Sequence, residues 1–209
     1  MIRIVTIDRE FGSGAGDIAR KLAGRLGWKL WDELLTAEIA RLMNCDSSTV
    51  EEREERLDPL GRKLLKAFLR GGFEGADTHR FLMVDADCIR DAAETVVRTA
   101  ATEGNCVIVG RGSAYYLQED PSAFHVFIYA PLEDKVLRLK AEGYSEKEAY
   151  RLAETVDRDR SAYIKKYFEV NWPAACHFYH LMINSAMGED IVVGIIVDSV
   201  ARQNALYRH

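Results

Sequence analysis

The chain has 209 residues, of which 48% are hydrophobic, so it is long enough for one well-buried core and short for two independent domains. Its 28 Lys and Arg residues stand against 33 Asp and Glu residues, and the net charge of -5 provides no overall positive field for nucleic acid or an anionic membrane. Any anion site must therefore be local, and we expect neither nucleic acid nor a membrane as a partner.

Cysteine usage and the start of the chain indicate the compartment. The cysteines at positions 45, 88, 106 and 176 form neither a CxxC pair nor a cluster with histidine, so they predict neither a zinc site nor a disulfide framework. They are typical of incidental thiols in a reducing cytosol. The chain begins directly with a strand pattern instead of a signal peptide, and no apolar run approaches membrane-spanning length. We expect a cytoplasmic protein.

The first predicted unit is a strand, a glycine-rich turn and a helix. Residues 2–7 (IRIVTI) form a β-branched apolar run, which is typical of a central parallel strand covered on both faces. After the turn, Ile18, Leu22 and Leu26 lie at helical spacing, and Gly27 ends the helix.

Strand and helix patterns then alternate to the end of the chain. Further strands are predicted at 28–32, 106–110, 125–130 and 180–185, and further helices at 34–43, 85–103, 131–143, 146–168 and 189–206. The charged segment 46–80 has a helical pattern loosened by glycines, and we expect a peripheral helical insertion there. The alternation predicts an α/β fold, with one domain over residues 1–209, a five-stranded parallel sheet, helices on both faces and right-handed crossovers.

Ligands bind at the carboxyl ends of the strands in such sheets, so the turn at 8–17 (DREFGSGAGD) is the first candidate site. Its glycines let the backbone turn tightly and point N–H groups into one concavity at the start of a helix. The alternative is a turn that needs glycine only for its shape. The position after the first buried strand favours an anion site, whose candidate residues are Arg9, Gly12, Ser13, Gly14, Ala15, Gly16 and Asp17.

This turn differs from the standard phosphate-binding loop, GxxxxGK(S/T). Ala15 stands where that loop has its lysine, and Gly16 stands where it has a hydroxyl residue. Backbone N–H groups can still hold phosphate, but with less charge stabilisation of a transferring group. Arg9 and Lys21 are the candidates to replace the lysine.

A second candidate is Arg111, which lies between two glycines immediately after a predicted strand. A guanidinium at a strand's carboxyl edge is well suited to contact phosphate or carboxylate through two hydrogen bonds. The alternative is a surface arginine in a turn, which the position makes the weaker interpretation.

The segment 157–168 (DRDRSAYIKKYF) supplies Arg158 and Arg160 on a long helix. Basic residues on a mobile helical arm can close over a nucleotide and neutralise charge as a phosphoryl group moves. The alternative is a solvated face on which these cations alternate with Asp157 and Asp159.

Two polar residues follow other strands. Asp32, with Glu33, is suited to hold magnesium through water or to bind a substrate hydroxyl, and equally to cap the following helix. Asn184 is suited to contact an adenine base or to cap a turn. The histidines show no metal-ligand spacing, and we predict no metal site built by the protein.

Five segments together resemble the cytidylate-kinase-like family, a branch of the P-loop nucleoside monophosphate kinases: IDREFGSGAGDIARKLAGRLGWKLWD, VIVGRGSAYYL, FIYAPLEDKVLRL, DRDRSAYIKKYF and LMINS. They occur in the same order over nearly the whole chain. The resemblance implies a P-loop core, ATP phosphates at Gly12 to Gly16, a helical lid at about 145–170 that contains Arg158 and Arg160, and a phosphate acceptor near Asp32 and Arg111.

The chain departs from true cytidylate kinases at the acceptor as well as in the loop. Glu38 stands where those enzymes carry an arginine, and Gly112 stands where they carry the aspartate that helps to read cytosine. These departures argue against CMP as the acceptor.

Our main hypothesis is a phosphotransferase that uses ATP and Mg2+ to transfer the γ-phosphoryl group to a nucleoside monophosphate or another small acceptor. Arg111, Arg158 and Arg160 would stabilise the transferring group, and no general base is required, because an acceptor phosphate is already nucleophilic. The alternative is a nucleotide-binding sensor without turnover. The remaining arginines disfavour a purely structural protein. The closing helix suits either the core or the interface of a homo-oligomer.

Overall fold

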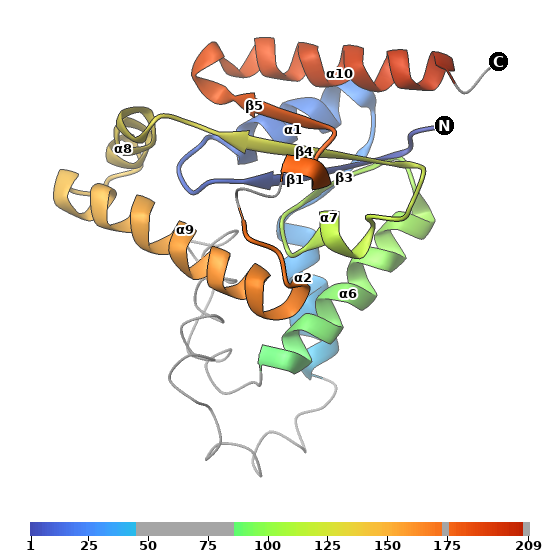
Figure 1. The fold of residues 1–209 in the computed structure, drawn as a ribbon, viewed down its shortest axis with the longest axis horizontal. Coiled ribbons are helices and arrows are strands. Elements are labelled where there is room, and N and C mark those ends of the chain that lie inside the picture. Colours follow the sequence, from blue (N-terminus) through green and yellow to red (C-terminus); the bar gives the residue numbers. More distant parts are fainter. Residues whose placement is uncertain (45–85, 173–175, 207–209) are drawn as a thin grey trace.

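Five parallel strands form the central sheet, in the order β2-β3-β1-β4-β5 (Figure 1). The structure is a computed structural model that describes residues 1–44, 86–172 and 176–206, so the insertion predicted at 46–80 lies outside the described residues. The strands are β1 (Ile4–Arg9), β2 (Lys29–Trp31), β3 (Cys106–Val109), β4 (Ala123–Tyr129) and β5 (Leu181–Asn184). This confirms the predicted α/β class and the parallel sheet.

Helices cover both faces of this sheet. They are α1 (Ala15–Leu26), α2 (Glu33–Asn44), α6 (Ala86–Glu103), the one-turn α7 (Ser113–Tyr116), α8 (Leu132–Ala141), α9 (Glu146–Phe168) and α10 (Glu189–Leu206), with 3-10 turns η1 (Cys176–Phe178) and η2 (Ser185–Met187). In Figure 1, α1 and α10 lie above the sheet, and α2, α6, α7 and α9 lie below it. No described helix is long and apolar enough to cross a membrane.

Alternating side chains of β1 divide the core between the two faces. Val5 and Ile7 pack with α1 and α10, whereas Ile4 packs with α2, α6 and α7. The side chains of α10 that face the sheet, Val192, Ile196 and Val200, are buried in the first cluster. The apolar stripe of the closing helix is therefore used within this chain.

The long helix α9 is capped and packed along its length. Ser145 and Glu148 form the predicted capping box, in which the Ser145 hydroxyl accepts from the Glu148 N–H. Near its start Ala149 and Ala153 pack on α8, and near its end Tyr163 and Ile164 pack in the cluster below the sheet. In this structure α9 is thus a packed element of the fold.

A buried histidine gives the fold a measurable response to acid. His125, on β4, is 2% exposed and its Nδ1 lies 2.7 Å from the Thr6 hydroxyl. Burial, followed by the neighbouring His180, lowers the pKa of His125 from 6.5 to about 4. The folded protein therefore keeps this ring neutral where the unfolded chain binds a proton.

We expect the free energy of unfolding to fall as pH decreases from about 6.5 to about 4, with His125 contributing up to about 3 kcal/mol of the loss. Denaturant titrations of the wild type and of His125→Asn across this range measure the effect. The variant should show a shallower pH dependence, while the exposed His177→Asn should match the wild type. Equal slopes in all three proteins would contradict the assignment.

Candidate functional site

Sheet register brings three polar segments together at the carboxyl edge. Ile7 pairs with Val109, and Trp31 pairs with Ile108, so the residues that follow these strands are neighbours. The Gly110 N–H donates to the Ile7 carbonyl at 2.9 Å. The segments that meet here are Asp8–Arg9 from β1, Asp32 after β2 and Gly110–Arg111 after β3.

Arg9 takes the space that a side chain at position 110 would need. An ideal Cβ on Gly110 would lie 2.0 Å from Nη1 of Arg9, and the Gly110 φ of +68° is itself in the left-handed region. The GRG sequence thus has a physical reason, because any larger residue at its first position would displace the Arg9 guanidinium.

Arg111 is held in an uncommon backbone conformation. Its φ is 58°, and its side chain is buried, with the residue 8% exposed. A non-glycine residue with left-handed φ costs on the order of 1 kcal/mol, and such strain gathers at functional sites. Two flanking glycines allow the chain to make this turn.

Arg160 reaches the same edge from α9. Its Nη1 donates to the Arg9 carbonyl and lies 3.4 Å from Oδ1 of Asp157, and its guanidinium carbon is 5.8 Å from the centre of the Trp172 ring. Among the described residues, Nη2 of Arg160 is buried without a hydrogen-bond partner. A buried donor without a partner is an unsatisfied polar group, and an anionic ligand could satisfy it.

The three guanidinium groups are close enough to affect one another. Burial and then the charge of Arg160 lower the pKa of Arg9 to about 10, while burial and then the charge of Arg9 lower the pKa of Arg111 to about 9. Asp32 acts in the opposite direction on both. We call Arg9, Arg111 and Arg160 the arginine cluster. An anion bound among these groups would relieve their repulsion.

Asp8 lies buried beneath this cluster. The Tyr179 hydroxyl donates to its Oδ2 at 2.8 Å, and Tyr179 in turn lies 2.8 Å from the Tyr115 hydroxyl. Burial raises the pKa of Asp8, against the opposing effects of Tyr179, Arg9 and Arg160. The two tyrosines therefore hold the floor of the site in place.

The glycine-rich turn has the geometry of an anion-binding loop. Gly12 and Gly14 both have φ of +75°, and Gly14 precedes the first residue of α1 without any side-chain cap on the helix. Ser13 is buried, and its hydroxyl has no hydrogen-bond partner among the described residues. The first N–H groups of α1 are left for a ligand.

A buried ionic network ties this loop to α8 and α9. Nζ of Lys135 lies 2.7 Å from Oε2 of Glu10 and 3.1 Å from Oδ2 of Asp157. The Phe11 N–H donates to the other oxygen of Asp157 at 2.8 Å. Asp157 is therefore part of the support of the loop, and the solvated face considered for it does not describe its position.

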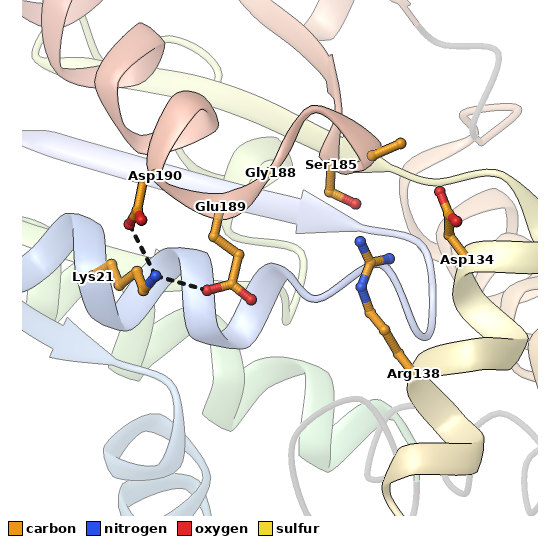
Figure 2. A pocket seen from close by; sticks show the side chains of 8 residues that line it. Lys21, Asp134, Arg138, Ser185, Gly188, Glu189 and Asp190 are labelled. Carbon is orange, nitrogen blue, oxygen red and sulfur yellow. Dashed lines mark hydrogen bonds and ion pairs between the residues drawn. The ribbon is translucent and has the colours of Figure 1, made fainter.

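Other predicted residues lie around the loop and the helices. Lys21 is paired with Glu189 and Asp190 of α10, at 3.0 and 2.9 Å, and does not reach the loop (Figure 2). Arg158 is exposed on α9.

The remaining predicted residues belong to the loop and to the end of β5. Asp17 is exposed and pairs with Arg20, whereas Ala15 is buried and Gly16 has no neighbour within 4 Å of an ideal Cβ. Asn184 caps η2 by accepting from the Ala186 N–H at 2.9 Å.

Sequence reasoning missed Glu10, Lys135, Arg138 and Trp172. Glu10 belongs to the loop, and Lys135 and Arg138 lie beside it because β4 pairs directly with β1, which places α8 beside residues 10–14. A signal existed in the pair Lys135 and Arg138, which lie one helical turn apart on the helix that follows β4. This signal could be interpreted only with the strand order known, because the pairing of β4 with β1 is what places the helix beside the loop.

Two solved structures illustrate the similarity of the fold. An uncharacterized protein from Eubacterium ventriosum ATCC 27560 is 24% identical with a TM-score of 0.66, over 97% of this chain and 99% of that chain. A shikimate kinase from Acinetobacter baumannii in complex with shikimate is 14% identical with a TM-score of 0.52, over 97% of this chain and 94% of that chain. At these identities the likeness concerns the fold alone. No curated protein matches the sequence.

The chain has a P-loop kinase-like fold, because its parallel sheet carries a glycine-rich loop between β1 and α1. The profile of the Cytidylate kinase-like family matches residues 4–187. The chain belongs to this family.

The position of the missing aspartate explains one departure from the cytidylate kinase pattern. An ideal Cβ on Gly112 would lie 2.8 Å from Cζ of Phe168, and the Gly112 φ is +73°. We expect Gly112→Asp to lower the free energy of unfolding by about 1–3 kcal/mol through overpacking and backbone strain. Gly24→Ala, in open space on α1, should be neutral or stabilising. Denaturant titration compares the two, and an equally stable Gly112→Asp would contradict the packing argument.

The lowered pKa of Arg111 predicts that anion binding by the arginine cluster depends on pH. Sulfate keeps its charge over the alkaline range, whereas Arg111 loses its own above a pKa of about 9. We expect sulfate affinity, measured by calorimetry, to fall between about pH 7.5 and about pH 10.5, and Arg111→Gln to show weak binding with less pH dependence. Circular dichroism at each pH verifies folding. A flat wild-type profile would exclude the cluster as the sulfate site.

Proposed function

We propose that the protein is a phosphotransferase that moves the γ-phosphoryl group of ATP to a nucleoside monophosphate or another small anionic acceptor. The observation that carries the proposal is the convergence of Arg9, Arg111 and Arg160 beside a glycine-rich loop at the start of α1. The loop supplies N–H groups for the donor phosphates, and the cluster supplies charge for the acceptor and the group in transfer.

On this proposal, the donor phosphates lie against residues Gly12 to Asp17, where the N-terminal end of α1 favours negative charge. The Ser13 hydroxyl, which has no partner among the described residues, is a further donor inside the loop. Asn184 and the turn after β5 lie at the same edge, on the side of α10, and would face the rest of the nucleotide.

The acceptor would bind among Arg9, Arg111 and Arg160, and the charge of Asp32 favours the charged form of the first two by raising their pKa values. An oxygen of the acceptor attacks the γ-phosphorus, and the bond to the β-phosphate oxygen breaks as ADP leaves. The guanidinium groups stabilise charge on the transferring oxygens, so positioning and electrostatics account for the rate. Arg158 would join this group only through a movement of α9.

Magnesium would accompany ATP, held mainly by its phosphates and by water. The described residues contain no group of three His, Cys, Asp or Glu side chains that could hold a metal ion. The loop position that usually offers a hydroxyl is Gly16, and Asp32 acts on two arginines instead. We therefore assign no step to a metal held by the protein.

A sensor that binds nucleotide without turnover is the second candidate, and the observation in its favour is Ala15 and Gly16 in the loop. A screen with labelled ATP against nucleoside monophosphates and small phosphorylated or carboxylated acceptors separates the two functions. Phosphoryl transfer supports the kinase. Nucleotide binding with no transfer to any acceptor supports the sensor, and no nucleotide binding rejects both.

With an acceptor identified, we expect Arg111→Ala to lower kcat/KM about 100-fold or more, because a buried charge contact to the transferring group is lost. Arg111→Lys should recover only part of it, since lysine cannot form the paired contact. Arg98→Ala removes an exposed cation of α6 that pairs with Glu94 and should leave kcat/KM unchanged. Full activity in Arg111→Ala would contradict the assigned role.

A further inference from the structure

Arg138, on α8, faces the loop from outside. Its Nη1 donates to the Gly12 carbonyl at 3.2 Å, and an ideal Cβ on Gly14 would lie 3.3 Å from its Nε. The guanidinium therefore lies directly on the Gly12–Gly14 turn, where the backbone N–H groups of the loop and of α1 begin.

A cavity of about 410 Å³ opens beside this guanidinium (Figure 2). It lies between α1, α8 and the turn that joins β5 to α10, and its charged and hydroxyl-bearing lining residues are Lys21, Asp134, Arg138, Ser185, Glu189 and Asp190. Ser185 is 2% exposed, and among the described residues its hydroxyl has no hydrogen-bond partner. The lining of the cavity thus contains the Ser185 hydroxyl, unpaired within the described part of the chain, as well as the Arg138 cation.

The two cations of this cavity are in different electrostatic situations. Lys21 is paired with both Glu189 and Asp190, so these carboxylates largely neutralise its charge. Arg138 makes its hydrogen bond to a neutral carbonyl and forms no ion pair with any described residue. Its remaining N–H groups and its charge are therefore available to a ligand.

We propose that Arg138 supplies, from α8, the positive charge on the donor phosphates that a lysine supplies within loops of the standard pattern. The cavity beside it then receives the rest of the donor nucleotide. The inference rests on the proposed function and adds the residue that compensates for Ala15. It also gives Gly14 a purpose, because a side chain there would push the guanidinium away from the loop.

The test measures binding of ATP, tripolyphosphate and adenosine to the full chain by calorimetry, with weak binders measured by competition. Arg138→Ala should lower the affinity for ATP and for tripolyphosphate by roughly 10- to 100-fold, as expected for the loss of a charged hydrogen bond. The affinity for adenosine should not change. Arg138→Lys should recover part of the loss. Lys140→Ala is the matched control, because Lys140 is an exposed cation of the same helix that pairs with Glu146.

The outcomes separate this inference from the proposed function. Wild-type affinity for ATP and tripolyphosphate in Arg138→Ala, with turnover intact, overturns the role of Arg138 and leaves the phosphotransferase standing. Equal losses of affinity for adenosine and for ATP, in a variant with unchanged thermal unfolding, also overturn it. Adenosine has no phosphate, so the loss of a phosphate contact cannot weaken its binding. Absence of any ATP binding by the wild type rejects the proposed function itself.

Discussion

The half-buried Arg9 side chain is the constraint on which the carboxyl edge of the sheet depends. A charge partly removed from water needs opposite charge and space around it, and the neighbouring segments provide both. Asp32 balances its charge from the end of β2, and Gly110 leaves room for it beside β3. Arg160 crosses from α9 to its carbonyl. Three strands and one helix thus meet around a single side chain.

The loop provides backbone N–H groups, and the positive charge comes from arginines outside it. Phosphate-binding loops usually combine backbone N–H groups with one internal lysine, but this chain keeps the backbone part alone, since Ala15 and Gly16 carry no charge. Positive groups lie instead on elements that surround the loop: Arg111 after β3, Arg160 on α9 and Arg138 on α8. Charge placed on separate elements depends on tertiary structure for its position. The network of Lys135, Glu10 and Asp157 holds two of those elements against the loop.

The sequence predicted the fold well because its signals are local. Apolar runs located the strands, Gly27 and the Ser145 capping box located helix ends, and alternation then required a parallel sheet. The one-turn α7 is too short for any period to show. The candidate site residues divided in the same way. Arg111 was predicted because it follows a strand, whereas Arg138 and Asp157 make contacts that only the pairing of β4 with β1 and the packing of α9 create. For the same reason Lys21, which is close in sequence, proved to bind α10.

Asp157 joins three parts of the molecule at one carboxylate: the Phe11 N–H, Lys135 of α8 and Arg160 of α9. A loop fixed in this way has little backbone freedom left to lose when a ligand arrives. The conformational entropy that a flexible glycine-rich segment would give up on binding has already been given up on folding. The glycines therefore serve shape and close approach without the flexibility usually associated with them, and a ligand would meet a preorganised surface.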